Sequence, residues 1–423
     1  MTERPTTHRL ARLRKAAGSL CVVPVICFAV AMIDGYDTLM MSFVAPLISK
    51  EWALAPQTFG KIFAGTYAGA ALGAALIGIA ADRFGRKPML IASLLLAGIC
   101  TCASAGSGGP AALMLWRAAA GIGLGGAIPI ISALAAMGAP LQKRRSAVTR
   151  VFIGYPIGAM IGGVATAAIM TIVGWRGVLL GGGALTLTIG LLGIWGIPND
   201  TSEPVSEGTN LRSKQPLVEL VAEGRARRTI LICLSAFLIL LVSYFLLSWM
   251  PIVLSLNGVD PRIAAMSGVL LNIGGLVGAW GLSTILGRRN PPRAVALCLA
   301  AGSVLIAWLG LGMTGAGPTA LVLMASIGIL IIGSQINVPA LCAHLYPVHL
   351  CATGVGLAMA VGRLGSIVGP LAGGYLVAAH LGWNRLFLLA ALPALLAALG
   401  IYALSPRQPD SAIGESVWDR SHG

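Results

Sequence analysis

Gly78-Ile79-Ala80-Ala81-Asp82-Arg83-Phe84-Gly85-Arg86-Lys87-Pro88 is a short basic segment between two apolar runs, near residues 57–80 and 89–107. Each run has about 20 residues, the length with which an α-helix crosses the hydrocarbon core of a bilayer. Lysine and arginine collect in short loops on the cytoplasmic side of a membrane. The plainest interpretation of the segment is therefore a tight cytoplasmic turn between two transmembrane helices.

Composition extends this interpretation to the whole chain. Apolar residues make up 57% of it and charged residues 10%, whereas soluble globular domains carry about 25% charged residues. Apolar windows of membrane-spanning length recur along the sequence, which predicts an all-α membrane protein with about twelve transmembrane helices. The windows lie near residues 21–48, 57–80, 89–107, 111–138, 147–171, 175–197, 229–254, 262–287, 293–314, 318–343, 352–378 and 384–404.

The net charge of +15 is also distributed as in a membrane protein. Basic residues are concentrated in alternate loops, and the intervening loops hold few. The clusters include Arg9, Arg12 and Arg14, then Arg83, Arg86 and Lys87, then Lys143, Arg144 and Arg145, then Arg225, Arg227 and Arg228. This positive-inside pattern accounts for the charge without a nucleic-acid partner and predicts that both termini are cytoplasmic.

Repeated motifs divide the chain into two similar halves. Gly174-Trp175-Arg176 recurs as Gly382-Trp383-Asn384, and Gly158-x-x-x-Gly162 recurs as Gly365-x-x-x-Gly369. Equivalent spans run in the same direction, so the repeat is parallel, a symmetry associated with two bundles that rock about a mid-membrane site. The expected parts are a cytoplasmic tail (1–19), a six-helix bundle (20–197), a cytoplasmic linker (198–228), a second six-helix bundle (229–404) and a cytoplasmic tail (405–423).

Two acids interrupt the first apolar window, in Asp34-Gly35-Tyr36-Asp37. A charged side chain at mid-bilayer costs ~2.5–3.5 kcal/mol on insertion scales, so the pair indicates a function. In a continuous helix both carboxylates face the same side. If the helix instead breaks at Gly35, they line an unwound segment that faces a cavity. Both alternatives are open at this point.

Two arginines also fall within apolar windows. Arg363 lies near the middle of its window, where snorkelling cannot carry the guanidinium to water. It either pairs with Asp34 or Asp37, or binds the carboxylate of a substrate bidentately. Arg117 lies in the outer third of its window, where snorkelling is one alternative and a structural ion pair with Asp34 or Asp37 is another. Since burial disfavours a carboxylate and a neighbouring arginine favours it, an acid that loses its arginine to a substrate anion would take up a proton.

Neutral polar side chains supply further candidates. Tyr36 and Tyr155 are placed to stack on an aromatic ring, although tyrosine is also common at membrane interfaces. Gln335 and Asn337 are suited to bind a hydroxylated ligand or to join helices. The eight cysteines are scattered and form no metal-ligand set. Without a nucleophile–base or metal cluster, neither an enzyme nor a cofactor is expected.

The complete pattern of residues 78–88 looks like the cytoplasmic signature of the major facilitator superfamily. The resemblance implies a conformational latch, in which the signature aspartate docks near a helix N-terminus of the other half. The latch residues would be Gly78, Asp82, Arg83, Gly85, Arg86 and Lys87. Arg117 is similar to the superfamily's intramembrane arginine, which implies a part in proton coupling.

Within the superfamily, the chain resembles the aromatic acid:proton symporters. Asp34-Gly35-Tyr36-Asp37, Arg117 and Gly362-Arg363-Leu364-Gly365 occur in the order seen in that family. The chain departs from the family at Tyr36, where phenylalanine is usual, and at Cys351, where arginine is usual. The resemblance implies a bacterial inner-membrane carrier, expected to be monomeric, that takes up benzoate-like acids with protons.

The sequence therefore predicts a transporter with two sets of residues. Proton coupling is assigned to Asp34, Asp37 and Arg117, and substrate binding to Arg363, Tyr36, Tyr155, Gln335 and Asn337. A proton-driven exporter of organic anions and a membrane chemosensor for aromatic acids are the alternatives. A sugar carrier is disfavoured, because Ile197-Pro198-Asn199-Asp200 stands where such carriers have a Pro-Glu-Ser-Pro-Arg-like motif.

Overall fold

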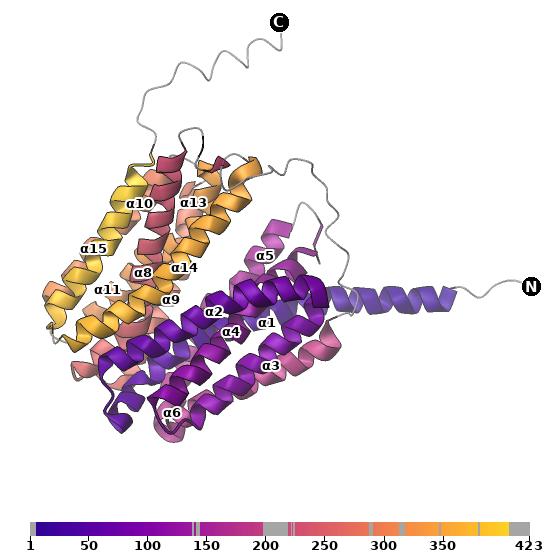
Figure 1. Cartoon of the computed structure of the whole chain (residues 1–423), viewed down its shortest axis with the longest axis horizontal. Coiled ribbons are helices and arrows are strands. Elements are labelled where there is room, and N and C mark those ends of the chain that lie inside the picture. The colour runs from indigo at the N-terminus through magenta and orange to yellow at the C-terminus, as the bar shows by residue number, and fades with distance from the viewer. Residues whose placement is uncertain are drawn as a thin grey trace, which may run out of the picture.

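The computed structural model describes residues 6–137, 139–140, 144–197, 219–220, 222, 225–286, 291–312, 318–346, 348–379 and 381–405. Throughout this part of the chain the regular structure is helical, without a strand. Figure 1 shows the helices in two groups, the first from α1 to α6 and the second from α8 to α15. The all-α fold predicted from composition is confirmed.

The first group follows the predicted apolar windows closely. Its helices are α1 (Thr6–Trp52), α2 (Pro56–Phe84), α3 (Arg86–Ala105), α4 (Pro110–Met137), the short α5 (Arg144–Phe152) and α6 (Gly154–Gly196). Between α2 and α3 the chain turns at Gly85, whose φ is 93°. Glycine adopts this left-handed conformation without steric penalty, so the tight turn predicted from residues 78–88 is confirmed.

α6 is a helical hairpin rather than one straight helix. Gly174, with φ 66° and ψ 178°, breaks the helical conformation in its middle. The first arm places Gly158 against Met32 of α1, and the second arm brings Gly196 back to Ile26 of α1. The two arms therefore run antiparallel along α1 and form two separate crossings.

The second group contains one broken crossing. Its helices are α8 (Ala226–Leu256), α9 (Pro261–Leu286), α10 (Pro291–Gly312), α11 (Pro318–Ile327), the π-helix η2 (Gly328–Ile332), α12 (Gly333–Ile336), α13 (Val338–Leu345), α14 (Val348–Ala378) and α15 (Trp383–Tyr402). The break between α12 and α13 lies at Asn337, just before Pro339. Proline has no backbone N–H to continue the helical hydrogen bonds and restricts the preceding residues.

Twelve crossings are present in the described residues, as the apolar windows predict. Ten helices are long and apolar enough to span a membrane, and one of these, Ser146–Gly196, contains the α6 hairpin and crosses twice. The remaining crossing is the broken segment from α11 to α13, whose apolar part covers Ala320–Ile336. The predicted domain boundaries stay predictions, since most of the linker 198–228 and of the tail 405–423 lies outside the described residues.

The repeated glycine motifs make equivalent contacts in the two groups. Gly158-x-x-x-Gly162 of α6 lies against α1, and Gly365-x-x-x-Gly369 of α14 lies against α8. A Cβ atom at Gly158 would overlap the carbonyl oxygen of Met32, and one at Gly365 would overlap that of Phe237. Because small residues let membrane helices approach closely, the sequence repeat is also a repeat of helix packing.

The repeated tryptophans tie equivalent turns to an earlier helix. Trp175, just after the α6 turn, donates its indole N–H to Glu51 Oε2 of α1 at 2.6 Å. Arg176 adds an ion pair with Glu51 Oε1 at 2.7 Å. In the second group, Trp383 donates its indole N–H to the carbonyl oxygen of Leu309 at 2.9 Å. The second group thus keeps a hydrogen bond from the tryptophan indole, but its acceptor is a backbone carbonyl in place of a glutamate side chain.

The two groups meet at one end and diverge at the other (Figure 1). Gly60 of α2 lies against Pro370 and Gly374 of α14. Phe63 of α2 meets Trp249 of α8 edge-on, with ring centroids 6.1 Å apart. These contacts lie in the first turns of α2, whereas the loop to α3 lies at its opposite end. We call the end defined by Gly60, Phe63, Trp249, Pro370 and Gly374 the closed end.

Candidate functional site

α1 carries both aspartates without a break, since it is helical from Thr6 to Trp52. The unwound alternative at Gly35 is therefore wrong. Gly35 instead lets α1 approach α6, because a Cβ atom there would overlap the carbonyl oxygen of Tyr155. Asp37 is only 2% exposed, whereas Asp34 is half-buried. The two carboxylates therefore occupy different environments.

Asp37 is held by a fully buried arginine. Arg117 of α4 is 0% exposed, so snorkelling to the membrane surface is excluded. Its Nη2 donates to Asp37 Oδ2 at 2.6 Å, and its Nη1 donates to Asp37 Oδ1 at 3.0 Å. Nη2 also donates to the Asp37 carbonyl oxygen at 3.2 Å. This bidentate, charge-assisted geometry is a strong one for an arginine and a carboxylate.

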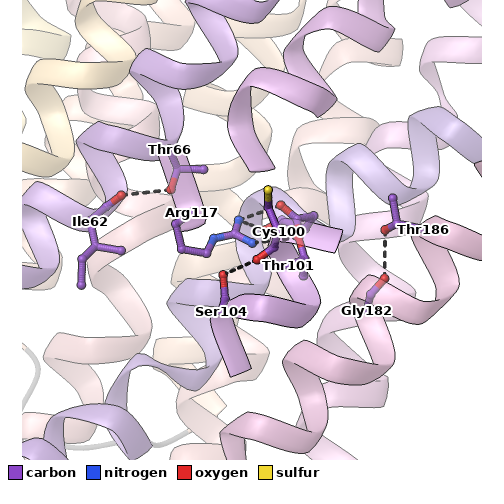
Figure 2. Close-up of polar contacts among 9 residues, drawn as sticks. Ile62, Thr66, Cys100, Thr101, Ser104, Arg117, Gly182 and Thr186 are labelled. Carbon is purple, nitrogen blue, oxygen red and sulfur yellow. Dashed lines mark hydrogen bonds and ion pairs between the residues drawn. The ribbon is translucent and has the colours of Figure 1, made fainter. Parts of the chain in front are cut away.

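α3 completes the surroundings of this ion pair. Thr101 Oγ1 donates to Asp37 Oδ1 at 3.1 Å and accepts from Arg117 Nη1 at 3.4 Å. Figure 2 shows Arg117 extending toward Thr101 and Cys100 of α3. Arg117 Nε is buried and has no hydrogen-bond partner among the described residues. Removing the charge of Asp37 would leave a buried cation largely uncompensated, so the pair is sensitive to protonation.

Asp34 and Arg363 come from different groups and do not form a direct ion pair. Arg363 of α14 is half-buried, and its charge acts on the Asp34 carboxyl and on the Tyr244 hydroxyl. Within the described part of the chain, neither Asp34 nor Arg363 has an ion-pair partner within 4.0 Å. Arg363 does not reach Asp37, which Arg117 holds. The guanidinium therefore lacks direct neutralisation in this state.

Two tyrosines accompany Asp34 and Arg363. Tyr155 of α6 and Tyr244 of α8 are half-buried, and both interact electrostatically with Asp34. The Tyr155 hydroxyl is buried and makes no hydrogen bond of full geometry within the described ranges, although the hydroxyls of Thr38 and Tyr244 lie close to it. Buried polar groups are nearly always hydrogen-bonded. A polar ligand would therefore improve the hydrogen bonding of a weakly paired hydroxyl.

Tyr36 makes a packing contact instead. Its ring lies against Gly162 of the first α6 arm and against Gly182 of the second. A Cβ atom at Gly162 would overlap the ring carbon Cδ2, and one at Gly182 would lie 2.9 Å from Cε1. The ring therefore fills the space between α1 and both arms of the hairpin. The glycine repeat in α6 provides room for it.

The two amides of the broken crossing differ in their contacts. Asn337 is 6% exposed and donates its side-chain amide to the carbonyl oxygens of Gly333 at 2.9 Å and Ala279 at 3.2 Å. It therefore joins α12 to α9, the packing alternative of the sequence prediction. Gln335 is half-buried, and its buried Oε1 has no hydrogen-bond partner in the described residues.

The predicted latch lies at the diverging end. Asp82 and Arg83 are exposed, and Gly85 forms the turn between α2 and α3. Within the described residues, Asp82 has no ion-pair partner within 4.0 Å. The aspartate therefore makes no ion pair with the described part of the second group in this state.

The other latch residues contact the first group. Gly78 lies beside Pro129 of α4, since a Cβ atom there would be 3.5 Å from the proline ring. Arg86 donates to the sulfur of Met137 at the end of α4. Lys87 is half-buried at the start of α3. These contacts fix the loop against α4.

Sequence reasoning missed three residues around the ion pair. Thr101 is hidden in an apolar window beside two cysteines. Tyr67 of α2 and Ser248 of α8 form a hydrogen bond of 3.3 Å between the two groups. Serine and threonine within apolar helices usually bond to their own backbone, and tyrosine is common at membrane interfaces, so residue type alone did not mark them. Their distinguishing feature is a partner far away in the sequence.

Comparison with known proteins assigns the fold to a family. Residues 26–370 match the Major Facilitator Superfamily. The chain belongs to this superfamily. It is therefore a multi-pass membrane transporter rather than an enzyme, as the signature at residues 78–88 predicts.

Related proteins cover nearly the whole chain. A gallate transporter of Pseudomonas putida is 32% identical, over 92% of this chain and 93% of the relative. The 4-hydroxybenzoate transporter PcaK of Acinetobacter baylyi is 29% identical, over 91% of both chains. These relatives confirm the resemblance to the aromatic acid transporter family. Among solved structures, a bacterial homologue of the human lysosomal transporter Spinster, inward-facing and occupied, shares the fold with a TM-score of 0.77 at 16% identity, over 90% of this chain and 96% of that one.

Proposed function

We propose that this protein is a proton-coupled symporter that imports an aromatic carboxylate by alternating access. The main support is the contrast between two charge sites. Asp37 and Arg117 neutralise each other in a fully buried bidentate pair. Asp34 and Arg363 are half-buried and, among the described residues, have no ion-pair partner within 4.0 Å. The first site is suited to coupling and the second to binding an anion.

The proposed substrate is a hydroxylated benzoate-like acid. Arg363 would bind its carboxylate, because the planar guanidinium matches a carboxylate with two parallel hydrogen bonds. Tyr155 offers a buried, weakly paired hydroxyl. Gln335 offers a buried amide oxygen without a hydrogen-bond partner among the described residues. A ring hydroxyl would satisfy either group. Tyr36 and Asn337 support the site through their helix contacts. The names of the relatives, which include gallate and 4-hydroxybenzoate transporters, agree with this substrate class.

The proton would be taken up when the substrate arrives. A cation near a carboxylate favours its charged form, and burial disfavours that form. Arg363 acts on the Asp34 carboxyl, so a bound substrate carboxylate that neutralises Arg363 would remove a charge that opposes protonation of Asp34. Asp37 provides a second acid, regulated by Arg117. One proton with one monoanion is electroneutral, whereas a second proton would add ~2.3 kcal/mol per 100 mV of membrane potential.

The charge pattern gives the proposed orientation in the bacterial inner membrane. If the basic loop 82–87 is cytoplasmic, as the positive-inside rule predicts, the closed end is extracellular. The described state is then inward-facing, and the exposed Asp82 is the released latch. Both termini would be cytoplasmic, and the monomer would be the transporting unit.

Uptake into proteoliposomes tests the function. Labelled hydroxybenzoates are offered to vesicles with an inwardly directed proton gradient. Accumulation that a protonophore abolishes is the expected result. Efflux from preloaded vesicles without accumulation would instead show an exporter. Binding of the panel without flux in either direction would show a chemosensor.

A further inference from the structure

Tyr67 lies between the Asp37–Arg117 pair and the second group. It is 6% exposed, and its hydroxyl forms a hydrogen bond of 3.3 Å with Ser248 Oγ of α8. Its ring meets Tyr244 edge-on, with centroids 4.8 Å apart. It also interacts electrostatically with both Arg117 and Asp37. One buried side chain therefore connects the ion pair with the interface between the groups.

The packing of α2 on α4 fixes Tyr67 relative to Arg117. A Cβ atom at Gly69 would overlap the carbonyl oxygen of Ala118, the residue that follows Arg117. The two helices are therefore in backbone contact at this level. Because close-packed helices of one bundle move together, Tyr67 and Arg117 remain neighbours when the two groups rock. Ser248, in contrast, moves with the second group.

Arg117 has a hydrogen-bond donor to spare, and Tyr67 has an oxygen that can accept a hydrogen bond. Arg117 Nε is a buried donor without a partner among the described residues. Among the described residues, the Tyr67 oxygen has one hydrogen-bond partner, Ser248. If the closed end opens, as the proposed alternating access requires, α8 withdraws and the Tyr67 oxygen loses this partner. A donor and an acceptor on neighbouring helices of the first group would then both be unsatisfied, which is unfavourable for buried groups.

We propose that Tyr67 is a positioning residue that exchanges hydrogen-bond partners during transport, with Ser248 when the closed end is closed and Arg117 Nε when it is open. Protonation of Asp37 weakens the carboxylate contacts of Arg117, and the released Tyr67 oxygen compensates for them. Protonation therefore favours opening of the closed end. This inference rests on the proton-coupled alternating access proposed above.

Other ionisable groups surround these residues and must be kept constant in a test. They are Asp34 and Tyr36 of α1, Cys100 of α3, Tyr155 of α6 and Tyr244 of α8, with Arg363 of α14 acting through Asp34 and Tyr244. Tyr67→Phe retains the ring and all of these groups, and removes a single oxygen atom. A comparison with the wild type therefore isolates the hydroxyl.

Hydrogen–deuterium exchange in proteoliposomes measures opening of the closed end. Exchange in peptides covering residues 56–67 and 245–254 is followed at acidic and neutral pH and corrected for the intrinsic pH dependence of amide exchange. The wild type should exchange faster at acidic pH. In Tyr67→Phe this acid response should shrink about fivefold. Ser248→Ala should exchange faster at both pH values and keep its acid response, because it loses only the closed-state bond.

Ser243→Ala is the matched control. Ser243 is a fully buried serine of the same helix without a hydrogen-bond partner in the described residues. This variant should behave like the wild type.

Two results would overturn the inference. If Tyr67→Phe and Ser248→Ala both exchange faster while keeping the full acid response, Tyr67 is only an interface contact. If the wild type lacks an acid response but shows proton-driven uptake, the partner exchange is wrong while the proposed function stands. Failure of proton-driven uptake itself would contradict the function, and the inference with it.

Discussion

The two aspartates of α1 are three residues apart in sequence but differ in partners. The Asp37 carboxylate accepts two hydrogen bonds from the Arg117 guanidinium and one from the Thr101 hydroxyl. The residue is 2% exposed. Asp34 is half-buried, and the charge with the largest effect on it, that of Arg363, comes from the other group. Because removing one partner of a buried ion pair leaves an uncompensated buried charge, the two residues should respond differently to neutralisation.

Neutralising Asp37 should destabilise the fold, whereas neutralising Asp34 should not. Asp37→Asn leaves the Arg117 charge buried and unpaired, which costs about 3–5 kcal/mol. The double variant Asp37→Asn with Arg117→Gln should recover most of that loss, since no buried charge remains. Thermal unfolding in detergent measures the three variants. Equal stability of Asp37→Asn and Asp34→Asn would contradict the account of the ion pair.

Arg363→Lys tests the carboxylate-binding role. Lysine keeps the charge but loses the planar fork, so substrate affinity should fall about tenfold, as expected for the loss of one charge-assisted hydrogen bond. The KM of uptake and direct binding measurements give the change. Arg385→Lys, at an exposed position of α15, is the control for the same substitution. Unchanged affinity in Arg363→Lys would remove this residue from the substrate site.

At the scale of single residues, the sequence predicts which charged residues are unusual for an apolar helix, but not which of them form pairs. A charge in an apolar window is visible by type, so Asp34, Asp37 and Arg363 could be selected. The partner of Arg117 could not be chosen, because four chain segments contribute to the pair and its surroundings. Thr101 escaped attention because a threonine hydroxyl in a helix usually bonds to its own backbone. Tyr67 escaped attention because tyrosine is common at membrane interfaces.

At the scale of the helices, glycine repeats determine which elements touch. The repeat of glycines at four-residue spacing predicts close packing, and the structure confirms it for α6 on α1 and α14 on α8. The π-helix η2 was not predictable, because residues 318–343 form an apolar window without a signal for altered hydrogen bonding. The break at Asn337 follows from Pro339, but the amide bonds of Asn337 to α9 depend on tertiary packing.

Added methyl groups at these crossings should weaken the fold. Gly158→Ala and Gly365→Ala would each force a methyl into a backbone carbonyl, at about 1–3 kcal/mol for overpacking. Gly181 of α6 and Gly356 of α14 are matched controls, because a Cβ atom there meets nothing within 4 Å. Thermal unfolding should show lower stability only in the first pair. If all four variants unfold alike, close helix approach does not explain the repeat.

At the scale of the whole molecule, two helical groups meet at one end and separate at the other. The closed end is apolar and aromatic, with Phe63 against Trp249 and Gly60 against Pro370. The ion pair lies wholly in the first group, whereas Arg363 belongs to the second. Rocking of the groups, as proposed, would change the distance between the proposed coupling residues and the proposed anion site. This geometry would give substrate binding a physical means of affecting a proton site.

The most direct test of that claim follows protons and substrate together. Proteoliposomes with a trapped pH-sensitive dye are given a hydroxybenzoate that the wild type transports, without an imposed gradient. The account predicts that substrate entry acidifies the lumen in the wild type, and that Asp34→Asn and Asp37→Asn abolish acidification while counterflow exchange of substrate continues. Acidification of equal size in the wild type and both variants would show that these aspartates do not couple protons to transport.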